Sequence, residues 1–222
     1  MIIGITGTSG SGKTTVSNIL ANKYNAFVID ADKVAKELNE PGSEYMNEIE
    51  KELGKKFILP DGNLNRKELA NEIYNNISSK NKLDKITFKF VINRVLEIIK
   101  TQTDEEYIVV DIPLLFESGF ENFCDYTISL ISDFDTKVKR ICSRDNLDEE
   151  TAKKRLKIQQ EDSYYVEKSD YVIRNTNDCN LEEEIERIID KIEQIWKYQI
   201  LIMSYQKNLL LSIHMIKEMK QD

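Results

Sequence analysis

The sequence predicts an α/β fold of three layers, with a parallel five-stranded sheet between layers of helices. Short apolar and β-branched runs alternate along the 222 residues with stretches in which apolar residues have helical spacing. A glycine-rich loop directly follows the first of these runs, which is typical of phosphate-binding folds. The runs are continuously apolar, as in strands buried on both faces, so we expect the strands to be parallel.

Five short apolar runs predict the strands. The first is followed by the glycine loop and then by helical spacing from Val16 to Tyr24, so the chain begins as strand, loop and helix. Helix-like sequence also separates the later runs, as expected for parallel strands joined by crossover helices. The runs are residues 2–6, 26–29, 107–112, 126–131 and 171–173.

Two longer segments interrupt this alternation. Residues 31–106 have no convincing strand but several stretches of helical spacing, which predicts a helical insertion. Residues 137–168 are charged and helical, and we interpret them either as a solvated amphipathic pair of helices or as a mobile flap. The sheet domain would then consist of residues 1–30, 107–136 and 169–195, followed by a tail of residues 196–222.

Composition indicates a globular, acidic protein. The chain is 41% hydrophobic, and 31 basic against 39 acidic residues give a net charge of −8. Such a chain is a poor nonspecific binder of nucleic acid, so we expect no nucleic-acid partner. Three widely separated cysteines argue against a disulfide framework or a zinc cluster and favour free thiols in a reducing cytosol. The N-terminus has no signal-peptide pattern, and we expect a cytoplasmic protein.

The tail is rich in Ile, Leu and Met, but lysines, glutamines and an asparagine interrupt it. This pattern argues against a membrane-spanning helix, so we expect no membrane partner. Instead it predicts a helix that packs on the domain or on a partner. Leu209, Leu210, Leu211 and Ile213 would pack within the chain or in a dimer contact, and we expect a monomer or a weak homo-oligomer.

The strongest motif is the loop Gly7–Thr14, which reads GTSGSGKT and matches GxxxxGK[ST] between a predicted strand and a predicted helix. Its glycines let successive backbone N–H groups and the helix N-terminus face a polyphosphate. The Lys13 ammonium would reach the outer phosphates, and the Thr14 hydroxyl is a hard oxygen ligand for Mg²⁺. The alternative is a chance glycine turn.

Three acids follow predicted strands at the carboxyl edge, where open α/β sheets bind ligands. Asp30 and Asp32 follow the second strand, where a carboxylate would orient an acceptor hydroxyl and take its proton. Asp111 ends the most apolar strand and would hold Mg²⁺ directly or through water. Each acid could instead cap a helix or a turn. The only histidine, His214, lies in the tail, so an imidazole base is not expected.

Three arginines are candidates to clamp a phosphate-bearing acceptor or to neutralise transferring charge. Arg66 lies in the insertion, whereas Arg140 and Arg144 are four residues apart on a predicted helix and share one face. For each of them, a surface ion pair is the alternative.

The order of these motifs resembles one family, the dephospho-coenzyme A kinases. The resemblance covers residues 2–195 and implies a P-loop kinase fold with a nucleotide-binding core, a helical acceptor domain and a lid. It implies ATP with Mg²⁺ and, as acceptor, the ribose 3′-hydroxyl of dephospho-coenzyme A, in the last step of coenzyme A biosynthesis. The pieces that carry it are GITGTSGSGKTT, VIDADKVAKEL, Glu40-Pro41-Gly42, DGNLNRKELA, DIPLLFESG, KRICSRDNL, Gln159 and SDYVIRN.

By this resemblance, Asp32 is the base, and Arg66 and Arg144 are contacts to the acceptor and to phosphate. Asn175 is similar to a residue on the adenine side, and Arg140 and Gln159 are weaker candidates for lid contacts to ATP. The phosphate loop would comprise Gly10, Ser11, Gly12, Lys13, Thr14 and Thr15.

The chain departs from the family pattern at two places. Thr87-Phe88 stands where the family usually carries His-Pro, and Ser169-Asp170 stands where it more often reads Ala-Asp. The first change leaves open a P-loop kinase of another nucleoside or nucleotide acceptor. A non-catalytic nucleotide switch is a further alternative, although the sequence has no guanine-reading NKxD tetrad.

Overall fold

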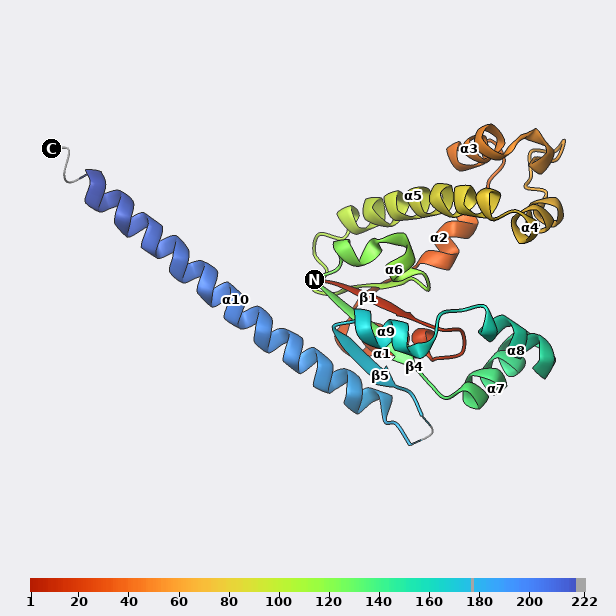
Figure 1. The fold of residues 1–222 in the computed structure, drawn as a ribbon. Helices are drawn as coiled ribbons and strands as arrows, with labels where there is room; N and C mark the ends of the chain where they lie inside the picture. The colour runs from red at the N-terminus through yellow and green to blue at the C-terminus, as the bar shows by residue number, and fades with distance from the viewer. Residues whose placement is uncertain (177, 219–222) are drawn as a thin grey trace. The chain divides into compact units, whose positions relative to one another are not determined.

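A computed structural model describes residues 1–176 and 178–218, with the side chains of 199–200 and 203–218 outside the description. The chain forms two compact units, Met1–Cys179 and Asn180–Asp222. The first unit contains the sheet and all helices up to residue 168, and the second contains a single helix, α10 (Leu181–Glu218) (Figure 1).

The first unit is built on a five-stranded parallel sheet, as predicted. The strand order is β2-β3-β1-β4-β5, so the first strand lies at the centre. Ile2 pairs with Ile108 on one side of β1, and Ile3 pairs with Tyr126 on the other. The strands are β1 (Ile2–Gly7), β2 (Phe27–Asp30), β3 (Ile108–Asp111), β4 (Tyr126–Ile131) and β5 (Tyr171–Arg174).

Helices cover both faces of the sheet. Side chains from alternate strand positions, such as Val110, pack in one cluster with the following helices and with Tyr165. The cluster involves α6 (Leu115–Ser118), the 3-10 helix η2 (Phe120–Phe123) and α9 (Asp162–Lys168). Gly4 belongs on this face, because a Cβ there would lie 2.8 Å from Cys124 Sγ. The intervening positions face the other way, and α1 (Lys13–Tyr24) contacts β1, β2 and β3.

The predicted insertion between the second and third strands is helical. Its helices over residues 44–53, 55–57 and 66–75 surround a small core of their own, which includes Tyr45, Ile49 and Phe57. The last helix joins the two cores, because Ile86 packs in the insertion and Val95 packs in the cluster on the sheet. The helices are α2 (Ala31–Glu37), α3 (Glu44–Leu53), η1 (Lys55–Phe57), α4 (Arg66–Asn75) and α5 (Ile77–Thr101).

The charged segment after β4 folds as three helices rather than two. The first two, α7 (Phe134–Asp145) and α8 (Glu149–Lys157), pack through a small cluster that includes Ile141 and Leu156. The third is α9, which buries Tyr165 in the cluster on the sheet. The segment therefore has its own small core at the start and is anchored to the sheet at its end.

The second unit is the helix α10. Ile185, Ile188, Ile189 and Ile192 are buried at helical spacing, whereas Trp196 is partly exposed. In the part of the chain that the structure describes, no helix is long and apolar enough to cross a lipid bilayer. Two features of the tail lie outside the described side chains. One is the predicted packing surface, and the other is the only histidine, His214. The residues of the packing surface are Leu209, Leu210, Leu211 and Ile213.

Candidate functional site

The glycine loop joins β1 to α1, as the motif predicts. Gly12 is the N-cap of α1 and has a φ of 107°, a value that L side chains rarely adopt. A Cβ at Gly12 would lie 2.2 Å from Asn175 Nδ2, and one at Gly10 would lie 2.7 Å from the Lys137 carbonyl oxygen. The loop therefore needs glycine at both positions, because neighbouring chain segments pack directly on its backbone.

Lys13 begins α1, and its ammonium turns back over the loop. Its Nζ donates to the carbonyl oxygens of Gly7, at 2.8 Å, and Thr8, at 3.3 Å. Burial lowers the pKa of Lys13, and the carboxylates of Asp111 and Asp32 oppose that shift. The lysine is thus a desolvated cation held between the loop and two acids.

Polar groups of the loop itself are available to a ligand. Thr14 and Thr15, in the first turn of α1, are exposed. The hydroxyls of Thr8 and Ser11 are buried and have no hydrogen-bond partner among the described residues. Unsatisfied buried hydroxyls are unfavourable, so a ligand or water that pairs with them would stabilise the loop.

The three acids differ in their surroundings. Asp30 is the N-cap of α2, where its Oδ1 accepts from the Lys33 N–H at 3.1 Å, so the helix-cap alternative is correct for this residue. Asp32 lies in the first turn of α2 and is exposed. Asp111 ends β3 beside Asp30, and burial, opposed by Lys13, raises its pKa to about 6. Asp32 is therefore the acid that is open to a substrate hydroxyl.

The donor set near Lys13 suits a hard divalent cation that brings most of its own ligands. Asp111 supplies a carboxylate whose charge only Lys13 offsets, and Thr14 supplies an exposed hydroxyl. Among the described residues no group of three or more His, Cys, Asp or Glu could hold a metal by itself. Mg²⁺ in nucleotide sites needs no such group, because phosphate oxygens and water complete its shell. The residues present therefore fit Mg²⁺.

The two arginines of α7 contact the glycine loop from one helix face. Arg140 Nη1 donates to the Gly10 carbonyl oxygen at 3.2 Å, and its Nη2 donates to Asn175 Oδ1 at 3.3 Å. Arg144 Nη2 donates to Ser9 Oγ at 3.2 Å. The shared face inferred from their spacing is therefore directed at the loop.

Asn175, directly after β5, is buried and forms hydrogen bonds both to the loop and to Ser132, which directly follows β4. Its Nδ2 donates to the Ser11 carbonyl oxygen at 2.8 Å, and its own carbonyl oxygen accepts from Ser132 Oγ at 2.7 Å. Arg140 donates to its Oδ1, so both the nitrogen and the oxygen of the side-chain amide contact the protein. Asn175 thus links the glycine loop to the end of β5 and, through Arg140, to α7.

The sequence reasoning missed or underweighted two residues of the charged segment. Gln159 Oε1 accepts from the Ser9 backbone N–H at 2.9 Å, so the segment directly after α8 is also bound to the loop. Arg155 forms an ion pair of 2.7 Å with Asp145, which also pairs with Arg144. Gln159 was suggested by resemblance alone. Arg155 had no sequence signal beyond its charge, since only the packing of α8 on α7 places it beside Asp145.

Arg66 and Thr87, which stand out in the sequence, both lie in the insertion. Arg66 is the exposed first residue of α4, and no hydrogen bond or ion pair joins it to the glycine loop in the described part of the chain. The Thr87 hydroxyl lies 3.0 Å from the Tyr45 hydroxyl, and burial raises the pKa of that tyrosine. This hydrogen bond lies within the small core of the insertion.

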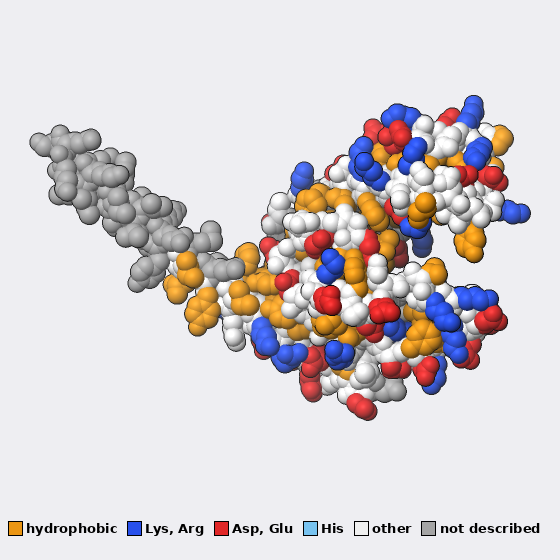
Figure 2. Space-filling view, viewed as in Figure 1, with side chains coloured by type: hydrophobic (Ala, Val, Ile, Leu, Met, Phe, Trp, Pro, Cys, Tyr) orange, Lys and Arg blue, Asp and Glu red, His pale blue; other side chains and the backbone are white. Residues whose placement is uncertain are grey.

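A recess separates the insertion from the charged segment. In Figure 2 the surface is hollowed between the part formed by α3 and α4 and the part formed by α7 and α8, both within the first unit. Lys13, Asp32, Asp111 and Arg144 belong to one electrostatic group, because the charges of the other three all act on the pKa of Lys13.

Comparison with known proteins identifies the relatives of this chain. The family model described as CoaE, dephospho-CoA kinase, matches residues 1–183. A dephospho-CoA kinase from Fusobacterium nucleatum is 39% identical over 193 residues, which are 86% of this chain and 98% of the relative. The solved structure of dephospho-CoA kinase from Campylobacter jejuni has a TM-score of 0.60 at 30% identity and covers 87% of this chain and 97% of its own. TT1252 from Thermus thermophilus has a TM-score of 0.70 at 27% identity, covering 87% and 96%.

Proposed function

The chain belongs to the dephospho-CoA kinase family, and we propose that the cleft around Lys13, Asp32 and Asp111 transfers the γ-phosphoryl group of ATP to the ribose 3′-hydroxyl of dephospho-coenzyme A. One observation supports the assignment of this reaction to the site. A desolvated lysine on a glycine loop, a buried acid and an exposed acid meet at the carboxyl edge of the sheet. This is the set of groups that phosphoryl transfer requires.

The reaction follows from the placement of these groups. The ribose 3′-oxygen forms a bond to the γ-phosphorus as the bond from that phosphorus to the β,γ-bridging oxygen breaks. The hydroxyl proton passes to the Asp32 carboxylate, and ADP leaves with the bridging oxygen. Lys13 and Arg144 offset negative charge on the phosphates, and the loop amides hold them in place.

Mg²⁺ fits beside this group, held by the Thr14 hydroxyl and the Asp111 carboxylate. When bound, it neutralises charge on the outer phosphates of the nucleotide. The chain's own task there is to keep Asp111 ionised and aimed at the loop, and the cation Lys13 favours that ionised form.

The parts of the fold divide the work. We assign nucleotide binding to the core (1–30, 107–136, 169–195), acceptor binding to the insertion (31–106) with Arg66, and a lid function to residues 137–168. Arg140 and Asn175 hold the loop that carries Gly10, Ser11, Gly12, Lys13, Thr14 and Thr15. In this assignment the enzyme is cytoplasmic, its partners are ATP and dephospho-coenzyme A, and it is a monomer or a weak homo-oligomer.

The test is an acceptor panel. ADP release is measured with ATP and Mg²⁺ in the presence of dephospho-coenzyme A, adenosine, nucleoside monophosphates or no acceptor, and the product mass is determined. We expect turnover with dephospho-coenzyme A and a product heavier by one phosphate. The Lys13→Ala variant, which loses the buried ammonium, should lose most of this turnover. Preference for another acceptor would contradict the proposal.

A further inference from the structure

Two arginines from different helices meet on one carboxylate. Asp145 is the last residue of α7, and its Oδ1 accepts from Arg144 Nε at 2.7 Å. Its Oδ2 accepts from Arg144 Nη2 at 2.9 Å and from Arg155 Nη1 of α8 at 2.7 Å. A single acid therefore binds one guanidinium group by two hydrogen bonds and a second guanidinium group by one.

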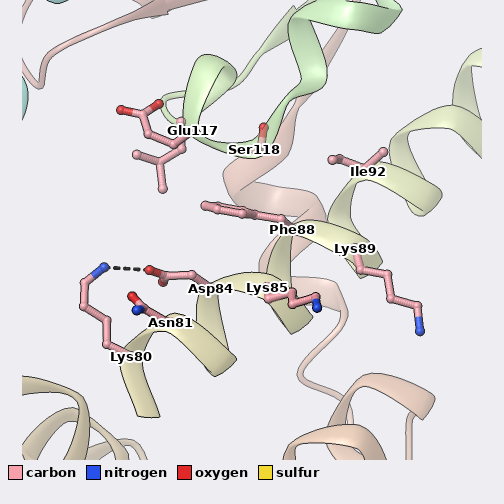
Figure 3. A pocket seen from close by; sticks show the side chains of 10 residues that line it. Lys80, Asn81, Asp84, Lys85, Phe88, Lys89, Ile92, Glu117 and Ser118 are labelled. Atoms are coloured by element: carbon pink, nitrogen blue, oxygen red, sulfur yellow. Dashed lines mark hydrogen bonds and ion pairs between the residues drawn. The ribbon is translucent and has the colours of Figure 1, made fainter. Parts of the chain in front are cut away.

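This arrangement differs from an ordinary surface ion pair. Figure 3 shows such a pair, in which Lys80 and Asp84 of α5 lie 2.6 Å apart and both side chains are exposed. Pairs of this kind contribute little to stability. Asp145 is only 25% exposed and lies at the C-terminal end of a helix, where the helix dipole disfavours an acid. Hydrogen bonds from Arg144 hold the pKa of Asp145 below its usual range, so its partners account for the charge there.

Both guanidinium groups act on the proposed site of phosphoryl transfer. Arg144 Nη2 also donates to Ser9 Oγ of the glycine loop at 3.2 Å. Burial lowers the pKa of Lys13, and the charges of Arg144 and Arg155 add to that effect. The pKa of Arg144 is raised, chiefly by the hydrogen bonds just described, and the charge of Asp32 contributes. The two arginines therefore belong to the charged group around Lys13.

Both arginines keep donors for a ligand. A guanidinium group has five N–H donors. Among the described residues, no hydrogen bond uses Nη1 of Arg144 or Nε and Nη2 of Arg155. A phosphate can therefore bind these donors while Asp145 stays in place. Without Asp145, the two like charges would repel each other, and each half-exposed side chain would lose its fixed geometry.

We propose that Asp145 is a positioning residue that holds Arg144 and Arg155 together beside the glycine loop, so that both guanidinium groups offset charge on the transferring phosphoryl group. This inference rests on the proposed function, and it adds Arg155 to the groups on which the transfer depends. Because the two side chains are ordered before the nucleotide binds, the complex loses less entropy. A carboxylate that acted only through its own charge would repel a triphosphate, and its removal would then tighten ATP binding. The two roles predict opposite signs.

The test measures the Kd of ATP and of ADP for the full chain by calorimetry without acceptor. Asp145→Asn keeps the size of the side chain but removes its charge, and we expect it to weaken ATP about tenfold and ADP no more than about threefold. Asp145→Glu keeps the carboxylate and should recover most of the ATP affinity. With acceptor present, kcat of Asp145→Asn should fall about tenfold, and the KM of the acceptor should change less than twofold. Glu150→Gln is the matched control, because this exposed carboxylate of α8 pairs only with Lys154, and it should change neither Kd.

A second variant tests the arginine directly. Arg155→Met keeps an apolar stem without the guanidinium group and should weaken ATP about fivefold. Asp145→Asn combined with Arg155→Met should lose less than the product of the two single losses, because Asp145 acts partly through Arg155. Circular dichroism and thermal unfolding show whether each variant is folded.

Several results would overturn the inference. They are unchanged or tighter ATP binding in Asp145→Asn, equal losses for ATP and ADP, wild-type ATP binding in Arg155→Met, and single losses that multiply in the double variant. A chain that shows the expected binding pattern but transfers no phosphate to dephospho-coenzyme A would overturn only the proposed function.

Discussion

At the scale of single residues, three charged groups with different surroundings define the site. Lys13 is desolvated, Asp111 is partly buried with a raised pKa, and Asp32 is exposed at the first turn of α2. Their neighbour Asp30 is occupied by the helix cap. This difference between two acids only two residues apart favours Asp32 as the proton acceptor of the proposed reaction.

Replacement of Asp32 by Asn should lower kcat about a hundredfold or more, because the amide cannot take the hydroxyl proton. The Kd of ATP should remain near the wild-type value. Asp30→Asn is the matched control, since Asn caps a helix about as well as Asp and the cap would survive. Steady-state kinetics and nucleotide titration check both variants. A loss in Asp30→Asn as large as that in Asp32→Asn would remove the distinction between the two acids.

The raised pKa of Asp111 predicts a pH dependence of metal use. Below about pH 6 this carboxyl holds its proton and is a poor ligand, whereas above that pH it is ionised and free to bind Mg²⁺. The Mg²⁺ concentration needed for half-maximal turnover should therefore rise as the pH falls from 7 to 5. Excess Mg²⁺ competes with the proton and should restore part of the rate. In Asp111→Asn this competition between Mg²⁺ and the proton should be absent.

Sequence reasoning reached many of these residues but not their surroundings. The glycine spacing predicted the loop and Lys13, because backbone curvature and phosphate charge require those residue types. The residue pattern after the second strand left Asp30 and Asp32 equivalent, since the choice depends on the residue at which α2 begins, and only the family resemblance pointed to Asp32.

At the scale of elements, the charged segment is bound to the loop on which the phosphates would lie. α7 supplies Arg140 and Arg144, and Gln159, just after α8, accepts from Ser9. Two arginines of α7 and one residue that follows α8 therefore contact the same loop. If α7 and α8 move as a lid, these contacts with the loop either break or the loop moves together with the two helices.

Replacement of Gln159 by Ala should raise the KM of ATP about fivefold, which corresponds to the loss of one hydrogen bond to a partly buried N–H. The KM of the acceptor should change less, because Ser9 belongs to the nucleotide loop. Gln160→Ala is the matched control, since this neighbour is exposed. Initial-rate kinetics with each substrate varied in turn separate the two effects. Equal changes in both KM values would instead indicate a general loosening of the segment.

The strands were predictable to within one or two residues, because buried parallel strands read as continuous apolar runs. The arrangement of the charged segment after β4 was less predictable from the sequence. Its charged helices look alike in sequence, yet α7 and α8 pair with each other, whereas α9 packs Tyr165 on the sheet. Partner choice among similar helices depends on tertiary packing, which a single-sequence pattern does not contain.

At the scale of the whole molecule, the described site residues all lie in the first unit. The family match ends at residue 183, near the division between the units at Cys179 and Asn180. The second unit is one helix that continues through residue 195. The described site residues and the helix α10 therefore occupy separate parts of the sequence.

A chain that ends after Ile195 retains the four buried isoleucines of α10 and every site residue. We expect kcat and both KM values to remain within about twofold of the full chain. Light scattering of both chains checks the role of the removed part. A drop in molar mass beyond that of the deleted residues would assign the tail to a contact between copies, and a loss of activity would assign it to the site.

The strand at the centre of the sheet is also the first to leave the ribosome. β1 pairs with β3 and β4, which lie more than a hundred residues later, Ile2 with Ile108 and Ile3 with Tyr126. At about 5–20 residues per second, this apolar strand waits roughly ten seconds in the nascent chain without its partners. Its unpaired edges are open to aggregation during that interval. The yield of folded protein should therefore depend on translation speed and chaperone supply as well as on final stability.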